Sequence, residues 1–130
     1  MYIDGGYYMP VTKLQLYLKD CDGAIELYKK AFDATVNAIY RDEKNRIAHA
    51  EINIFGQCVA FMEQESECII GNTMQFSFYF NKGNEEIIEK AYDVLKDNAK
   101  IECPLGPCDW TSLIFCLIDK FGVNWLLCID

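Results

Sequence analysis

The chain has 130 residues, of which 52% are hydrophobic and 25% charged, a composition typical of one globular domain with its own core. Its net charge of −8 argues against nucleic acid as a partner, because such binding depends largely on Lys and Arg contacts to phosphate. No apolar run approaches the roughly 18 residues that span a membrane, and the N-terminus lacks the pattern of a secretory signal. We therefore expect a cytoplasmic protein without a membrane partner.

Seven cysteines occur along the chain, an odd number without a CxxC pair. This pattern predicts free thiols in a reducing compartment. A zinc site would need paired Cys or His ligands at short spacing, and the single histidine, His49, lies far from any such pair.

The first predicted elements are a strand at 13–18 and an amphipathic helix at about 21–33. Leucines alternate with polar positions in the strand, so one face is apolar and the other carries Gln15 and Tyr17. Apolar residues recur at helical spacing in the segment that follows the strand. A short strand around 37–41 and a hairpin at 46–65 come next, with His49 and Glu51 on the polar face of the hairpin. Residues 64–72 are the predicted linker.

The remainder of the chain repeats the first part at an offset of 60. Residues 14–33 align with 74–93 without a gap, and six positions are identical: Gln15/Gln75, Gly23/Gly83, Glu26/Glu86, Lys30/Lys90, Ala31/Ala91 and Asp33/Asp93. The second copy has a strand with Gln75 and Tyr79 on its polar face, then a helix. A short strand at 100–103 and strands at 109–119 and 123–129 follow, with a corner at 120–122.

Two tandem βαβββ modules are therefore predicted, about 11–65 and about 73–130, within one α+β domain covering 1–130. The apolar strand faces would pack under the helices, leaving the polar faces of a cupped, mostly antiparallel sheet open toward a ligand. The candidate ligand-binding residues are Gln15, Tyr17, Gln75, Tyr79, Trp110 and Cys128.

The closing strand carries residues with different predicted roles. Trp125 alternates with Leu126, so we expect Trp125 in the core and Leu126 and Cys128 on the open face. A nucleophilic Cys128 would need an activating base or positive charge, which Lys13 or His49 could supply. Trp110 follows the loop CPLGPCD and is a candidate for the pocket wall.

The chain resembles the vicinal oxygen chelate superfamily of glyoxalase I, bleomycin resistance proteins and extradiol dioxygenases, and within it the PhnB-like group. The residues that carry the resemblance are IAHAEINIFGQCVAF (47–61), KAYDVLKDNAKIECPL (90–105), Trp110 and IDKFGVNW (118–125). The resemblance implies the glyoxalase fold, a homodimer and a small-molecule site in each chain, but no particular reaction.

Metal-using members of this superfamily hold a divalent ion with a His or Gln from the first strand and a Glu from the last strand of each module. Carried over by the resemblance, these positions are Lys13, Gln75, Ala60 or Phe61, and Leu126. Gln75 alone is a usable ligand, because a protonated lysine has no free lone pair and the others are apolar. We therefore predict no metal and no cofactor.

Two classes of function remain open. The favoured one is a metal-independent small-molecule binder of the bleomycin resistance type. The alternative is a lyase- or isomerase-type enzyme. Such an enzyme would use either a divergent metal site that pairs Gln15 with Gln75, or His49 and Glu51 as an acid–base pair. A dimeric scaffold with a vestigial pocket is a third interpretation.

Overall fold

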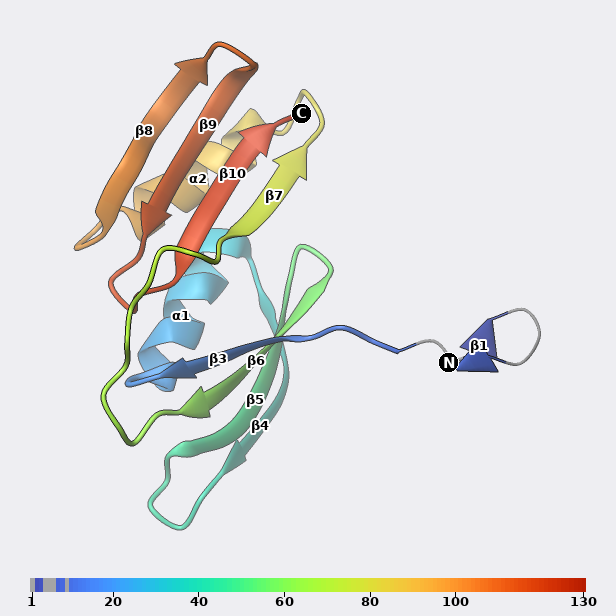
Figure 1. Ribbon diagram of the computed structural model, residues 1–130, viewed down its shortest axis with the longest axis vertical. Coiled ribbons are helices and arrows are strands. Elements are labelled where there is room, and N and C mark those ends of the chain that lie inside the picture. Colours follow the sequence, from blue (N-terminus) through green and yellow to red (C-terminus); the bar gives the residue numbers. More distant parts are fainter. Residues whose placement is uncertain (1, 4–6, 9) are drawn as a thin grey trace.

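The computed structural model describes residues 2–3, 7–8 and 10–130, which form ten strands and two helices (Figure 1). In chain order the elements are β1 (Tyr2–Ile3), β2 (Tyr7–Tyr8), β3 (Leu14–Leu18), α1 (Cys21–Phe32), β4 (Thr35–Arg41), β5 (Ile47–Ile54), β6 (Gln57–Glu63), β7 (Phe76–Phe80), α2 (Glu85–Leu95), β8 (Lys100–Cys108), β9 (Thr111–Ile118) and β10 (Asn124–Ile129).

From β3 onward the elements form two copies of the same βαβββ unit, which confirms the predicted architecture. Module 1 is a four-stranded sheet of order β3-β6-β5-β4, and module 2 a four-stranded sheet of order β7-β10-β9-β8. In each sheet the first strand of the module pairs in parallel with its last strand, and the other pairs are antiparallel. The two sheets occupy the two halves of the molecule, upper and lower in Figure 1.

Strand β8 is longer than the sequence predicted, because it continues past Cys103 to Cys108. The five added residues include prolines at 104 and 107. However, β8 lies at the edge of its sheet and pairs with β9 alone, so a residue without an N–H group is tolerated there. The strand predicted to begin at Asp109 begins at Thr111.

Each helix covers one face of its sheet and leaves the other face open. Helix α1 packs on β5 and β6, helix α2 packs on β9 and β10, and the two helices pack on each other. Asp20 is the N-cap of α1, and its side chain accepts a hydrogen bond from the Gly23 amide at 2.9 Å. The helix-facing sides of both sheets join into one buried core.

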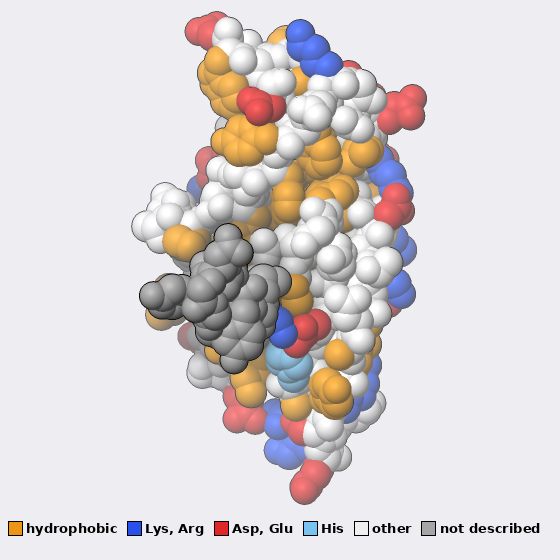
Figure 2. Space-filling view, turned by 90° about the vertical axis from the view of Figure 1, so that its right-hand side faces the viewer, with side chains coloured by type: hydrophobic (Ala, Val, Ile, Leu, Met, Phe, Trp, Pro, Cys, Tyr) orange, Lys and Arg blue, Asp and Glu red, His pale blue; other side chains and the backbone are white. Residues whose placement is uncertain are grey.

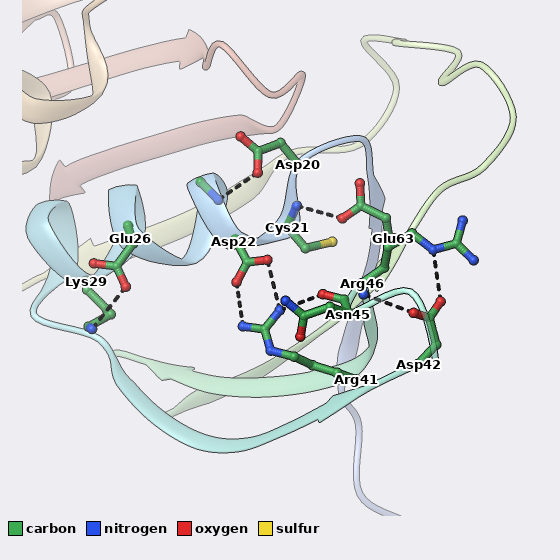
Figure 3. A network of polar contacts seen from close by, with 11 residues as sticks. Asp20, Cys21, Asp22, Glu26, Lys29, Arg41, Asp42, Asn45, Arg46 and Glu63 are labelled. Atoms are coloured by element: carbon green, nitrogen blue, oxygen red, sulfur yellow. Dashed lines mark hydrogen bonds and ion pairs between the residues drawn. The ribbon is translucent and has the colours of Figure 1, made fainter.

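Polar contacts hold the start of α1 against the sheet of module 1 (Figure 3). The Arg41 guanidinium on β4 pairs with the Asp22 carboxylate on α1 at 2.8 Å, and Nη1 of Arg41 also donates to the Asn45 carbonyl oxygen. The Glu63 carboxylate at the end of β6 accepts a hydrogen bond from the Cys21 amide at 3.1 Å. These contacts add to the apolar packing of α1 on one face of the sheet, and the opposite face of β3, β5 and β6 is not covered by the helix.

A buried aromatic and carboxylate cluster joins the two modules. Trp125 on β10 is completely buried, which confirms its predicted core position, and its ring lies 5.2 Å from that of Tyr28 and 4.8 Å from that of Phe32 on α1. The carboxylate of Asp119 accepts hydrogen bonds from both the Tyr28 hydroxyl and the Trp125 indole. Module 2 therefore docks directly on the helix of module 1.

In the described part of the chain, neither helix has the length and apolar character needed to cross a membrane. All seven cysteines lie within residues 10–130, and all are free thiols.

Candidate functional site

A cluster of four polar side chains occupies the open face of module 1. Glu51 on β5 is contacted by Lys13, just before β3, by His49 on β5 and by Cys58 on β6, and we call these four residues the Glu51 cluster. The side chains gather there because β6 lies between β3 and β5, with Ala60 opposite both Gln15 and Glu51. Figure 2 shows the histidine at the surface, with acidic and basic side chains beside it.

Glu51 is the centre of this cluster. Nζ of Lys13 lies 3.1 Å from both carboxylate oxygens of Glu51. Nε2 of His49 lies 2.7 Å from Oε2, and the Cys58 thiol donates to Oε1 at 3.3 Å. The hydrogen bond to His49, followed by those to Lys13 and Cys58, lowers the pKa of Glu51 to about 2. The carboxylate is therefore ionised at every physiological pH.

The charge on Glu51 determines what its neighbours can do. Hydrogen bonding to Glu51 raises the pKa of Lys13, so this side chain is an ammonium group without a lone pair for a metal. Burial, and then the bond to Glu51, raises the pKa of Cys58, which disfavours the nucleophilic thiolate. When His49 carries its proton on Nε2, the proton points to Glu51 and Nδ1 is left as an acceptor.

The open face of module 2 is less charged. Nε2 of Gln75 donates to the Asn124 side chain at 3.1 Å, and the Ser77 hydroxyl donates to Oε1 of Gln75 at 3.4 Å. The Tyr79 side chain is exposed on the same face. Leu126 lies between Ser77 on β7 and Cys116 on β9, so an apolar side chain occupies the middle of this face.

The two remaining candidates from the sequence lie elsewhere on module 2. Cys128 has no exposed surface, and burial raises the pKa of its thiol. Lys13 and His49, suggested as its activating groups, lie beside Cys58 on the other module instead. Trp110 is 63% exposed in the turn between β8 and β9, where it borders a hollow together with Asp109.

A cavity of about 440 Å³ lies between β3, the linker and the turn before β10. Gln15 and Tyr17 both line it, as do Gln64 and Asn124, whereas His49, Gln75, Tyr79, Trp110 and Cys128 do not. Within one chain the candidates therefore lie in different places: Gln15 and Tyr17 at the cavity, and His49 with Glu51 in the Glu51 cluster. Gln75 does not line the cavity but donates to Asn124, which does. Their role as one ligand site remains a prediction.

Sequence reasoning did not identify Lys13 and Cys58 as partners of Glu51. The strand patterns placed Lys13 and Glu51 on polar faces, but the two residues are 38 positions apart. Their contact depends on the register of β3 against β6, which alternation along either strand does not define. In the described residues, no group of three or more His, Cys, Asp and Glu side chains is arranged to share a metal ion.

Two tandem βαβββ modules, each with an open polar sheet face, define a glyoxalase-type protein. The chain belongs to the Glyoxalase/Bleomycin resistance protein/Dioxygenase superfamily, whose family model matches residues 11–127. None of the curated proteins matches the chain.

Solved structures show the same fold at low sequence identity. A Bacillus cereus protein described as a putative 3-demethylubiquinone-9 3-methyltransferase, PhnB protein, has a TM-score of 0.79 at 22% identity, with 92% of this chain and 98% of that chain covered. A Pseudomonas aeruginosa protein has a TM-score of 0.74 at 19% identity, with the same coverage. The fosfomycin resistance protein FosX from Listeria monocytogenes, as a mutant complexed with Mn(II) and a dihydroxypropylphosphonic acid, has a TM-score of 0.70 at 14% identity, covering 94% and 93%.

Proposed function

We propose that this PhnB-like chain binds a small organic molecule without a metal ion, and that the Glu51 cluster forms the polar part of the binding site. The observation that carries the proposal is the position of Lys13, whose ammonium nitrogen lies 3.1 Å from both oxygens of Glu51. Lys13 stands where the family resemblance places a metal ligand of module 1. An ammonium at that position repels a divalent cation and neutralises the nearest carboxylate.

The chemistry of the open faces supports an organic ligand with hydrogen-bonding groups. The Glu51 cluster offers an ionised carboxylate and an imidazole, while Tyr17 and Tyr79 offer aromatic surface and hydroxyl groups. The amides of Gln15 and Gln75 supply both donors and acceptors. An organic molecule with both polar and aromatic parts would match these groups, because ligand sites combine apolar or aromatic walls with a few placed polar groups.

A second candidate function is proton transfer by His49. Its Nε2 lies 2.7 Å from the Glu51 carboxylate, which would hold the ring in one orientation and stabilise the imidazolium formed when Nδ1 accepts a proton. In this alternative the protein is an isomerase- or lyase-type enzyme. The substitution His49→Asn tests this alternative, because asparagine keeps a hydrogen-bonding group but cannot transfer a proton. It should abolish turnover in the enzyme, whereas in the binder it should only weaken ligand binding.

We propose a second copy of the chain as partner. The segment between β6 and β7 exposes Ile69, Ile70 and Met74, with Ile69 99% exposed, around the same cavity as the half-exposed Tyr17. A second chain that covers these side chains would also enlarge the site formed by the open faces. Sedimentation should show a dimer that Ile69→Glu dissociates and that Ile87→Glu, the same change on helix α2, leaves intact.

We propose a cytoplasmic location on the basis of the free thiols. Seven free cysteines in 130 residues suit a reducing cytoplasm, because an oxidising compartment would convert neighbouring thiols to disulfides.

Native mass spectrometry of protein purified from cells without chelators tests the binding proposal. We expect an organic adduct, no stoichiometric divalent metal, and loss of the adduct in Glu51→Gln. Glu89→Gln, the same change on the exposed surface of helix α2, should retain the adduct. A stoichiometric metal ion that is lost in Gln15→Ala or Gln75→Ala would overturn the metal-independent proposal.

A further inference from the structure

Two cysteines face each other across neighbouring strands on the open face of module 2. Cys103 on β8 and Cys116 on β9 are register partners in an antiparallel pair. Such partners have Cα atoms about 4.5–5.5 Å apart, within the roughly 4.4–6.8 Å that disulfides require. Both side chains are half-buried and so within reach of small reagents. A bond between them requires side-chain rotation and only a small movement of the backbone.

The position of Cys116 places this pair in the middle of the module 2 face. Its neighbours along β9, Phe115 and Leu117, are buried in the core, so Cys116 points to the opposite, open side. Across the sheet its partner on β10 is Leu126. Cys116 therefore borders the position where, by the family resemblance, metal-using relatives present a carboxylate, and Cys103 lies one strand further away.

The local backbone can accommodate a covalent bond. Strand β8 is an edge strand held by β9 alone, and its register against β9 shifts on both sides of Cys103. The next residue, Pro104, has no N–H group to give to the sheet. Sγ of Cys103 lies 3.9 Å from the Pro104 carbonyl oxygen, a weak contact that leaves the thiol free to turn.

The other cysteines, all of which lie in the described part of the chain, have different surroundings. Cys21 and Cys128 have no exposed surface. Cys58 donates to Glu51, Cys68 contacts the Tyr17 carbonyl oxygen, and the register partner of Cys108 is Thr111. Among the paired strands, Cys103 and Cys116 are the two cysteines that stand directly opposite each other.

We propose that Cys103 and Cys116 form a redox-active dithiol that a peroxide oxidises to a cross-strand disulfide. The Cys103 thiolate attacks one oxygen of hydrogen peroxide, the O–O bond breaks and hydroxide leaves, which gives a sulfenic acid. The Cys116 sulfur then attacks the Cys103 sulfur, the S–S bond forms, and the sulfenic oxygen leaves as water. In sum, two thiols and one peroxide give one disulfide and two waters.

The environment of Cys116 makes the second step, the attack on the Cys103 sulfur, depend on pH. Burial, and then the nearby Cys103 thiol, raises the pKa of Cys116 to about 11. The thiolate that completes the disulfide is therefore scarce at neutral pH, and the rate of disulfide formation should rise with pH.

Intact-mass and peptide analysis of the reduced full-length chain, treated with hydrogen peroxide, tests the proposal without any ligand. We expect loss of two hydrogens, a crosslink between the peptides containing Cys103 and Cys116, and reversal by dithiothreitol. Cys103→Ser and Cys116→Ser should each slow intramolecular disulfide formation by about tenfold or more. Cys68→Ser, the matched control, should leave the rate unchanged.

Phenylarsine oxide, which bridges two neighbouring thiols, gives a second readout. We expect one adduct on the parent chain and loss of this adduct in Cys103→Ser. A crosslink that maps to another cysteine pair, or parent-like disulfide formation in Cys103→Ser, would overturn the proposal. Neither readout depends on the Glu51 cluster, so the proposed binding function and the dithiol succeed or fail separately.

Discussion

Replacing Asp119 by asparagine should strongly destabilise the protein, because its carboxylate joins the two modules. Asp119 is 4% exposed and accepts four hydrogen bonds. Its Oδ2 accepts from the Tyr28 hydroxyl at 2.7 Å and from the Trp125 indole at 2.8 Å. Its Oδ1 accepts from the amides of Phe121 at 2.8 Å and Val123 at 3.1 Å. The first two bonds hold module 2 on helix α1, and the last two shape the turn before β10.

The magnitude follows from the bonds that asparagine can keep. Its oxygen can still accept from the two backbone amides, but its NH2 group cannot accept from Tyr28 and Trp125. Hydrogen bonds to a charged group each contribute about 1.5–3 kcal/mol, and a buried donor left unpaired costs a similar amount. The Tyr28 hydroxyl can turn and accept from the new NH2 group, which recovers part of the loss. We expect the free energy of unfolding to fall by about 3–4 kcal/mol.

Urea unfolding followed by tryptophan fluorescence measures this change. Trp110→Phe is the suitable background, because Trp110 is largely exposed and Trp125 then reports on the core alone. Tyr28→Phe removes one of the four bonds and should lower the free energy of unfolding by about 1.5–2 kcal/mol. The Asp119→Asn and Tyr28→Phe effects should be less than additive when combined, because both remove the same bond. A loss below about 1 kcal/mol in Asp119→Asn, or strict additivity, would refute the reasoning.

Three further predictions concern a carboxylate, a thiol and a glycine. The pKa of Glu51 is about 2 in the folded chain, below the ordinary 4.5, so its stabilising contacts persist above about pH 5 and are lost as the pH falls toward 2. The difference in unfolding free energy between the parent chain and Glu51→Gln, measured in urea, should therefore shrink over that range. A constant difference would contradict the lowered pKa. Burial, and then a nearby carboxylate, raises the pKa of Cys21 to about 12, so Ellman's reagent at neutral pH should label this thiol only after unfolding. Label on the Cys21 peptide of the native protein would contradict this prediction. Gly122→Ala should destabilise the chain more than the matched Gly83→Ala. Both positions have positive φ, so alanine costs about 1–2 kcal/mol at either, but a Cβ at Gly122 also meets the Ile70 side chain at 2.8 Å. Equal losses of stability in thermal unfolding would contradict the role of that contact.

The repeat explains why the architecture could be predicted from sequence. Residues 14–33 and 74–93 carry the same strand and helix pattern, so the assignment of elements in one copy can be tested against the other. Alternation along each strand also placed Gln15 and Tyr17 on an open face and Trp125 in the core. These features depend on local periodicity, which a single sequence contains. The part of β8 beyond Cys103 was not predicted, and tolerance of the prolines in it depends on the position of the strand in its sheet.

The contacts of the candidate site depend on register between strands, which a single sequence does not contain. The Glu51 cluster forms because β3 and β5 both pair with β6, and this pairing brings Lys13 to Glu51. The same limit applies to Cys103 and Cys116, whose pairing depends on a register shift between Ile101 and Cys103. Burial of Cys128 likewise follows from packing across the sheet, although alternation placed this residue on the open face.

The proposed function places the polar end of a small molecule at Glu51 and leaves the middle of the module 2 face, around Leu126, as an apolar wall. A crystal structure of protein purified from cells without chelators tests this claim most directly, because a ligand carried through purification would appear in the density. The account predicts an organic molecule within hydrogen-bonding distance of His49 or Glu51 and no metal ion between the two modules' open faces. A divalent ion bound by Gln15 or Gln75, with Lys13 turned away from Glu51, would contradict it.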